Sequence, residues 1–384
     1  MSIATTAQDG EQVQAMRDMV RDLAEKVIAP RAAETDAAEE FPWHVLEAYR
    51  EAGLLSLLVS EEHGGAAGTV VHETAIAEEL ARVDVSSAII FTTHSLCTEI
   101  IKRMATEEQK RDYLGRAVAG RLIAIGLTEP HAGSDAASIR TSARRTGERY
   151  VLNGTKQYCT NGDVSDVILV FAVTAPGKGA RGISVFAVER SNPGLRITRR
   201  EKKMGLHGTT TVEFVLEDCI VPESARLGPE HEGFYGAMFA LARGRVAIAG
   251  VAVGLGQGAM EQAAAYARER RQFGQSIGAF QGVQFMLADM AMEVEAARRL
   301  VYHAAALAVT DADGFQLASA QAKCFATDMA MRVATNAVQV FGGMGYMRGC
   351  PVERMMRDAK ILQIFDGTNQ IMRIIIAREM IGRL

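Results

Sequence analysis

The order of sequence patterns along the chain predicts an α+β fold with a helical segment, a β domain and a second helical segment. Three observations carry this prediction. Apolar residues recur at helical spacing before residue 120, short runs rich in Val, Ile, Phe and Thr follow, and long helical patterns return after residue 235. We expect an N-terminal helical domain at 1–121, an antiparallel β domain at 122–233 and a C-terminal helical bundle at 234–384.

The first segment shows helical spacing and no strand alternation. Pro42 precedes the apolar stretch 45–58, as expected shortly before a helix begins. The first helix is predicted to turn one apolar face to the core, formed by Met16, Met19, Val20, Leu23 and Val27.

The middle segment contains short β-type runs separated by Gly, Asn, Asp and Pro, which is typical of antiparallel strands joined by turns. This texture ends near Pro222. The runs expected to form strands are Tyr150–Leu152, Val167–Thr174, Gly182–Val188 and Thr211–Leu216.

The last segment is helical again. One helix is predicted from apolar residues that step by four and three, with the charged residues on other faces; they are Val283, Leu287, Met290, Val294, Ala297 and Val301. Residues 246–260 lack charge, but the stretch is short, Gly-rich and interrupted by Gln257. We interpret it as a buried helix and expect no membrane span.

Composition excludes several partners and compartments. The net charge of −4 offers no basic patch, so we expect neither nucleic acid nor an anionic membrane as partner. The five cysteines form no CxxC pair and indicate reduced thiols rather than a disulfide framework. Asp9 and Glu11 precede any basic residue, and no signal-like apolar run follows, so we expect a cytoplasmic protein.

Several kinds of site are absent from the sequence. The histidines show no HxH or HExxH spacing, so no metal site is expected, and there is no GxSxG elbow. The glycines at 254–258 lie inside a helical pattern, and those at 342–345 follow a helix rather than a strand. Neither fits the strand–GxGxxG–helix fingerprint, so we expect no Rossmann fold.

The run RDAKILQIFDGTNQIMR, residues 357–373, sets Asp366 between apolar Ile364 and Phe365 and the turn-formers that follow. A carboxylate beside apolar side chains loses hydration, its pKa rises and it becomes a plausible base at neutral pH. The alternative is that Asp366 only starts a turn or caps the helix that begins near Gln370.

Two polar segments in the middle of the chain are candidate ligand loops. In LTEPHAGSD (127–135), Gly133 would let the backbone approach a planar or anionic ligand. In KQYCTNG (156–162), Tyr158 and Thr160 are expected on one face of an extended segment, where they can cover a ring and bond a ring nitrogen. Ordinary polar loops and a strand end are the alternatives.

These segments, together with RERRQFG (268–274) and VFGGMGY (340–346), occur in the order and spacing of the acyl-CoA dehydrogenase family. The chain resembles that family over essentially its whole length. The resemblance implies a helical domain, a middle β domain and a C-terminal four-helix bundle, with FAD as cofactor.

The resemblance also implies roles for individual residues. It places beside the flavin or its dinucleotide a set taken from three segments: Ile125, Leu127, Thr128, Gly133, Ser134, Tyr158, Thr160, Thr368 and Gln370. The substrate would contact Ser134, Arg245 and Gly367. The FAD of a neighbouring subunit would contact Arg270, Gln272, Phe273, Gln281, Gln339 and Gly343, within a homotetramer built as a dimer of dimers. A basic group at a helix end, such as Arg270, is otherwise a solvated face.

The implied reaction is α,β-dehydrogenation of an acyl-CoA to a trans-2-enoyl-CoA. Asp366 would be the base, its backbone N–H a donor to the thioester carbonyl, and Arg245 would help to order the base and the ligand. Flavin N5 would accept the hydride, and an electron-transfer flavoprotein would take the electrons.

The sequence departs from the family at four positions. Most relatives have glutamate at Asp366, many have tryptophan at Tyr158, many have a CoA-contacting aspartate at Ala242, and one branch carries its base at Gly244. Three alternatives therefore stay open: a flavoenzyme for a cyclic or carrier-protein-bound acyl thioester, a nitroalkane-oxidase-like enzyme, and a catalytically silent flavin-binding protein.

Overall fold

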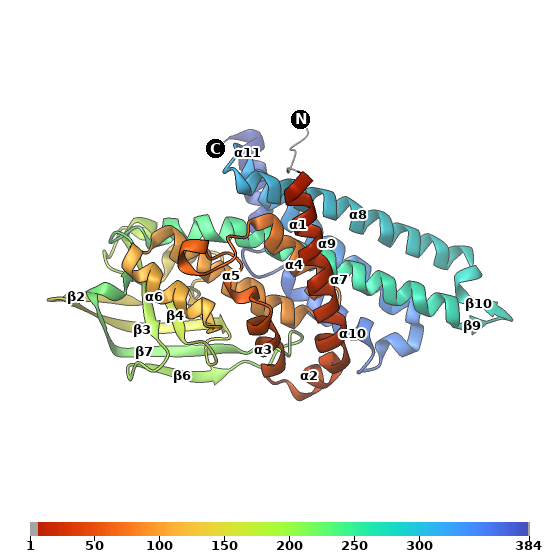
Figure 1. Ribbon diagram of the computed structural model, residues 1–384, viewed down its shortest axis with the longest axis horizontal. Coiled ribbons are helices and arrows are strands. Elements are labelled where there is room, and N and C mark those ends of the chain that lie inside the picture. The colour runs from red at the N-terminus through yellow and green to blue at the C-terminus, as the bar shows by residue number, and fades with distance from the viewer. Residues whose placement is uncertain (1–6, 383–384) are drawn as a thin grey trace.

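The computed structural model describes residues 7–382 (Figure 1). The first segment of these residues is helical. Its helices are α1 (Ala7–Leu23), α2 (Ala32–Ala38), α3 (Trp43–Glu51), α4 (Val70–Ala81), α5 (Val85–Met104) and α6 (Glu107–Val118). The buried stripe of the first helix runs through Val20, Ala24 and Ile28, whereas Met19 and Val27, predicted to be buried, are exposed. The buried residues step by four along one line, so the buried face is narrower than the predicted stripe and leaves its edge residues in solvent.

The middle of the chain forms one eight-stranded sheet in the order β6-β7-β3-β2-β4-β5-β8, with β1 beside β4. The strands are β1 (Ile123–Gly126), β2 (Ser142–Thr146), β3 (Arg149–Thr160), β4 (Val167–Val173), β5 (Ile183–Glu189), β6 (Leu195–Arg200), β7 (Thr211–Pro222) and β8 (Arg226–Leu227). The four predicted runs lie in β3, β4, β5 and β7. The sheet is antiparallel as expected except where β4 pairs with β1 and β2 in parallel.

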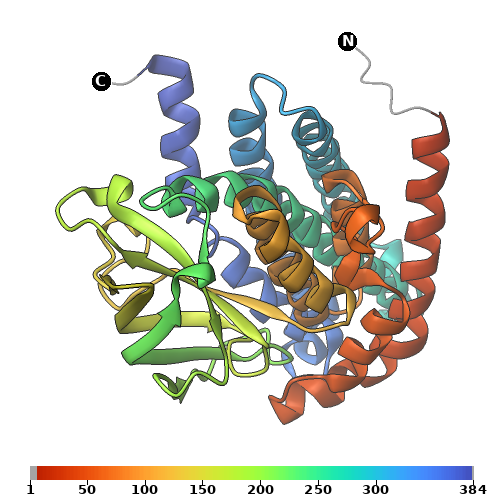
Figure 2. The ribbon, with the colours of Figure 1, turned by 60° about the vertical axis from the view of Figure 1, so that its left-hand side comes forward.

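The helices of the last segment are α7 (Gly233–Glu269), α8 (Gln281–Val309), α9 (Phe315–Phe341), α10 (Pro351–Leu362) and α11 (Asn369–Ile381). A small hairpin, β9 (Arg271–Gln272) and β10 (Gln275–Ser276), joins α7 to α8. The predicted face of α8 is confirmed, because Met290, Val294, Ala297 and Val301 are buried. Figure 2 shows the sheet on one side of the molecule and the long helices on the other.

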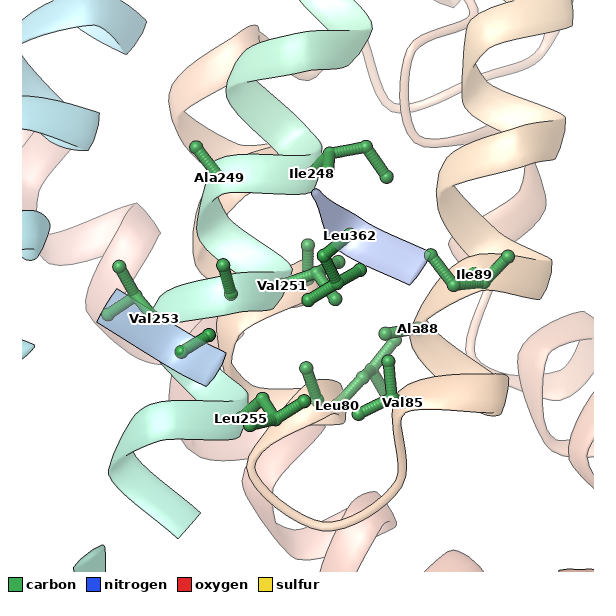
Figure 3. Packing of buried hydrophobic residues seen from close by; sticks show 14 of the residues in the cluster. Leu80, Val85, Ala88, Ile89, Ile248, Ala249, Val251, Val253, Leu255 and Leu362 are labelled. Carbon is green, nitrogen blue, oxygen red and sulfur yellow. The ribbon is translucent and has the colours of Figure 1, made fainter. Parts of the chain in front are cut away.

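A single apolar core joins the two helical segments around α7. Figure 3 shows side chains of α4, α5, α7 and α10 meeting there, among them Leu80, Ile89, Val251, Leu255 and Leu362. α4 and its C-terminal end can approach α7 closely because Gly254 and Gly258 have no side chain. A Cβ atom at Gly254 would lie 2.0 Å from the carbonyl oxygen of Glu78, and one at Gly258 would lie 2.0 Å from that of Arg82. These glycines therefore serve helix packing, not phosphate binding.

Within the described residues, α7 is the one helix long and apolar enough to cross a membrane by length and composition. Its most apolar window is 83% buried inside the protein. A helix covered in this way by its own chain is typical of a buried core helix, as the sequence predicted.

Candidate active site

The turn between α10 and α11 presents Asp366. Its backbone is left-handed, with φ 52°, and Gly367 follows with φ 94°. Thr368 caps α11, because its hydroxyl oxygen accepts a hydrogen bond from the N–H of Ile371 at 3.2 Å. Thr368 and not Asp366 therefore caps α11, so the capping half of the alternative is wrong, whereas the turn half agrees with the backbone of Asp366.

The carboxyl group of Asp366 has a raised pKa. Burial is the main cause, since desolvation disfavours the charged form. Two cations act in the opposite direction, Lys323 first and Arg245 second. The carboxyl group thus has an increased proton affinity, and the two cations limit how far its pKa rises.

Arg245 of α7 contacts the main chain at this turn. Its Nε donates to the backbone carbonyl oxygen of Asp366 at 3.1 Å, and only 8% of the residue is exposed. The backbone N–H of Asp366 has no hydrogen-bond partner among the residues that the structure describes. The turn therefore offers an unused donor beside a carboxylate.

Gly367 has a backbone conformation that favours glycine. A Cβ atom there would lie 2.7 Å from Cε of Met372 and 3.6 Å from a guanidinium nitrogen of Arg245. Because the Met372 methyl ends a flexible side chain and can move, the positive φ is the main reason why the residue after the carboxylate is glycine.

Lys323 of α9 lies under the same turn and was missed by sequence reasoning. It is fully buried, and Nζ donates to the carbonyl oxygen of Gly367 at 2.8 Å and to Oδ1 of Asn369 at 2.9 Å. One signal was available: Lys323 is the only charged residue between Phe315 and Thr327, a stretch that otherwise suits a buried helix.

The two candidate loops of the middle domain lie together. The N–H of Gln157 donates to the carbonyl oxygen of Thr128 at 2.8 Å, which joins KQYCTNG to LTEPHAGSD. The fully buried Lys156 reinforces this junction, because Nζ donates to the carbonyl of Leu127 at 3.1 Å and to Oε1 of Glu129 at 2.8 Å. Sequence reasoning also missed the Lys156–Glu129 pair.

Tyr158 and Thr160 flank the buried Cys159 at the end of β3. The regular alternation expected for this segment is interrupted, because the register with β7 shifts between Lys156 and Cys159. Tyr158 has φ 58° and is 60% exposed. A bulky residue held in the left-handed region is uncommon, and such strain is concentrated at functional sites.

Ligand space remains open around this junction. Gly133 and Ser134 are exposed, and a Cβ atom at Gly133 would meet nothing within 4 Å. Ile125 lies in β1, and with Leu127 and Thr128 it is only half-buried. The loop, the exposed tyrosine ring and the Thr160 hydroxyl thus suit a planar ligand with polar edges.

Three family models match the chain in succession. Acyl-CoA dehydrogenase, N-terminal domain, matches residues 10–121, the middle domain matches 124–219, and the C-terminal domain matches 231–381. An acyl-CoA dehydrogenase of Bacillus subtilis (strain 168) is 45% identical over 369 residues, covering 96% of this chain and 97% of the relative. The chain belongs to the acyl-CoA dehydrogenase family.

Solved structures agree with this assignment. Butyryl-CoA dehydrogenase from Megasphaera elsdenii aligns with TM-score 0.94 and 39% identity, covering 99% of this chain and all of that chain. A chain from a structure of the electron transferring flavoprotein of Acidaminococcus fermentans aligns with TM-score 0.96 and 44% identity over the full length of both chains. The predicted family and three-part fold are confirmed, and the protein is an oxidoreductase.

FAD is the cofactor of acyl-CoA dehydrogenases. The residues present fit it, since the open surface at Gly133 and the exposed ring of Tyr158 leave space for an isoalloxazine. Beside α11, a cavity of about 400 Å³ is lined by Asp328, Lys360, Gln363, Ile364, Asn369, Gln370 and Arg373. Gln370, one of the predicted dinucleotide contacts, therefore faces open space.

A second predicted group lies away from Asp366 in this chain. Arg270, Gln272 and Phe273 occupy the β9–β10 hairpin region, which Figure 1 shows at the end of the molecule opposite the sheet. Phe273 is 93% exposed, and the other members are exposed as well: Arg270, Gln272, Gln281, Gln339 and Gly343. One chain does not bring this group to the carboxylate.

The departures from the family pattern have structural counterparts. Ala242 is fully buried, and its carbonyl accepts a hydrogen bond from the Ser319 hydroxyl at 2.7 Å. A Cβ atom at Gly244 would lie 3.2 Å from Leu96, so α5 covers the position of the alternative base. No cluster of His, Cys, Asp and Glu that could hold a metal occurs between residues 7 and 382.

Proposed function

We propose that this protein converts an acyl-CoA thioester to the trans-2-enoyl-CoA with Asp366 as base. The observation that carries the proposal is the Asp366 turn, which combines a carboxyl group of raised pKa with an unpartnered backbone N–H. A base tuned toward neutral pH and a donor to the adjacent carbonyl are the two groups that α-proton abstraction requires.

The protein side of the reaction follows from these groups. The Asp366 N–H binds the thioester carbonyl and stabilises negative charge on its oxygen, which acidifies the α-proton. The Asp366 carboxylate takes this proton, and Arg245 keeps the main chain in place through its bond to the carbonyl. FAD, when bound, supplies the acceptor for the β-hydride at N5. Gly367 and Ser134 complete the substrate contacts.

The flavin side of the site is assigned to the loop and strand end of the middle domain. Thr128, Ser134 and Thr160 would supply hydroxyl donors, and Tyr158 would cover the ring. Gly133 would allow close approach of the backbone, and Ile125 and Leu127 would contribute the main chain at the start of the loop. The support for this assignment is the bond between Gln157 and Thr128, which puts both segments at one place.

We further propose a homotetramer built as a dimer of dimers. The exposed set named above, from Arg270 to Gly343, would reach the FAD of a neighbouring subunit, with Thr368 and Gln370 on the resident dinucleotide. The support for this is the exposure of the whole set in the single chain, with Phe273 93% exposed, which leaves these side chains available to a neighbouring subunit.

The electron acceptor proposed is an electron-transfer flavoprotein, supported by the neighbour of that description from Acidaminococcus fermentans. We assign the enzyme to the cytoplasm, on the support of five free cysteines, all buried.

Anaerobic titration with acyl-CoAs of graded length, branching and ring content tests the proposal. At least one should bleach the flavin, and the reduced enzyme should re-oxidise slowly in air but quickly with ferrocenium or an electron-transfer flavoprotein. Direct peroxide formation in air would instead identify an oxidase. If no acyl thioester in the panel reduces the flavin, the proposed reaction is wrong.

A further inference from the structure

Lys323 approaches the active-site turn from α9, the helix that packs beneath α11. Its side chain is fully buried, yet it carries a group that is normally charged and hydrated. Its hydrogen-bond acceptors are the carbonyl oxygen of Gly367 and the side-chain oxygen of Asn369. Both belong to the three residues that follow Asp366, so the lysine ties the exit of the turn to α9.

The acceptor on α11 is itself held in one orientation. Asn369 is 2% exposed, and its Nδ2 donates to Oγ1 of Thr327 at 2.9 Å and to Oδ1 of Asp328 at 2.7 Å. These bonds leave its Oδ1 directed at Lys323. A buried polar network with its members satisfied is rigid, so the position of the turn is defined from below.

The titratable groups that face Lys323 come from three directions. Asp366 lies in the turn, Arg245 projects from α7, and Cys324 and Asp328 lie on α9 itself. Burial lowers the pKa of Lys323 to about 8, while Asp366 raises it. The same attraction lowers the pKa of Asp366 against the effect of burial, and Lys323 contributes more to this than Arg245 does.

We propose that Lys323 is a positioning residue for the proton-abstraction step: it anchors the turn through Gly367 and Asn369 and brings a cationic group to the turn that carries Asp366. This inference rests on the proposed role of Asp366 as base. The two cations hold different parts of the turn. Arg245 binds the carbonyl oxygen of Asp366 itself, and Lys323 binds the residues after it. A tether without an electrostatic role would leave the ionisation of Asp366 unchanged.

The test compares Lys323→Met, which removes the charge and the donors, with Lys323→Arg, which keeps a charge. The FAD-loaded enzyme is mixed anaerobically with a substrate acyl-CoA, and flavin reduction is followed from pH 5.5 to 9. In Lys323→Met the acid limb of the rate profile should move up by about one pH unit, because the carboxyl group loses a neighbouring cation. The limiting rate should fall at least about tenfold with a smaller change in KM, since a displaced base affects the chemical step.

Lys323→Arg should leave the acid limb within a few tenths of a pH unit of its original place. Lys26→Met is the matched control, because that lysine is exposed and pairs only with Asp22; it should alter neither rate nor profile. An unmoved acid limb in Lys323→Met overturns the proposal, even if the rate falls.

Two further arms make every result decisive. Asp366→Asn is measured in parallel, and normal flavin reduction in this variant would show that Asp366 is not the base. If Asp366→Asn is inactive but the acid limb of the Lys323→Met rate profile does not move, only the proposal for the lysine is rejected. Lys323→Gln keeps an amide NH₂ donor group without charge and should show the same shift as Lys323→Met. Loss of FAD-loaded protein in both neutral variants would make Lys323 a folding residue and would also overturn its positioning role.

Discussion

The guanidinium of Arg245 and the main chain of Asp366 are joined by a hydrogen bond of 3.1 Å, although 121 positions separate the two residues in sequence. The bond goes to the backbone carbonyl oxygen and not to the carboxylate. Arg245 therefore holds the main chain of Asp366 without a hydrogen bond to its carboxylate oxygens, which stay available for a proton. This division is the physical basis of the first prediction.

Asp366→Asn should fold and bind FAD but reduce it at least about a thousandfold more slowly. Asparagine tolerates the left-handed backbone at this position, with φ 52°, but cannot accept the α-proton. Stopped-flow reduction with a substrate acyl-CoA measures the loss, and the flavin spectrum on substrate addition reports binding. Near-normal reduction in this variant would remove Asp366 from the chemistry.

Arg270→Ala should lower FAD occupancy after extensive dialysis. In the proposed tetramer its guanidinium makes a charge-assisted bond to the pyrophosphate of the neighbouring subunit, and such bonds are among the stronger polar contacts. The ratio of absorbance at 450 nm to that at 280 nm gives the occupancy. Arg196→Ala, at another exposed arginine on β6, is the control and should keep its FAD. Full occupancy in both variants would contradict the assignment.

Thr160→Val should shift the flavin potential or the reduction rate while the fold is kept. The two side chains have similar size, and the substitution removes only a hydroxyl from a half-buried strand end. Potentiometric titration and stopped-flow reduction measure the change. An identical spectrum, potential and rate would place Thr160 outside the flavin site.

Gly254→Ala should destabilise the protein by roughly 1–3 kcal/mol or more, because its Cβ would lie 2.0 Å from the Glu78 carbonyl oxygen and would force α4 away from α7. Gly282→Ala in α8 is the matched control. A Cβ there meets nothing within 4 Å, so that change should be neutral or stabilising by up to about 1 kcal/mol. The two effects are compared by the thermal unfolding midpoints of the FAD-loaded variants. Equal midpoints would show that α4 and α7 have room for a methyl group at Gly254.

Glu73→Gln should make stability less dependent on pH. Glu73 is 2% exposed, and burial, with the charge of Glu99 second, raises its pKa to about 8 from a usual 4.5. Above pH 4.5 the unfolded chain ionises this group while the folded chain keeps it protonated, so its stabilising contribution falls by about 1.4 kcal/mol per pH unit until pH 8.

Relative to the unaltered protein, Glu73→Gln should therefore gain stability as pH rises from 5 to 8. Unfolding midpoints at both pH values measure this gain. Glu47→Gln, at an exposed and ion-paired position, should show no such trend. A pH-independent difference for Glu73→Gln would mean that the buried carboxyl is ionised throughout.

The local elements of the fold were predictable because periodicity records which side of an element is buried. The face of α8 followed from the spacing of its apolar residues, and the strands β3, β4, β5 and β7 followed from short runs rich in Val, Ile, Phe and Thr between turn-forming residues. The short β1 was missed, since four residues carry little periodic signal, and β6 was missed because its sequence LRITRR is mostly polar. The parallel pairing of β1 with β4 was also not predictable, because long-range packing decides which strands pair.

At the site, the sequence by itself determined the order of the domains, the family and the unusual surroundings of Asp366, because apolar neighbours and turn-formers are local information. Only the tertiary structure decided which charges act on that carboxylate. Lys323 and Arg245 reach the turn from other helices, and the Tyr158 bulge depends on the register with β7. A buried charge is tolerated only beside its partners, and those partners are defined by how distant segments pack, which no pattern along the chain records.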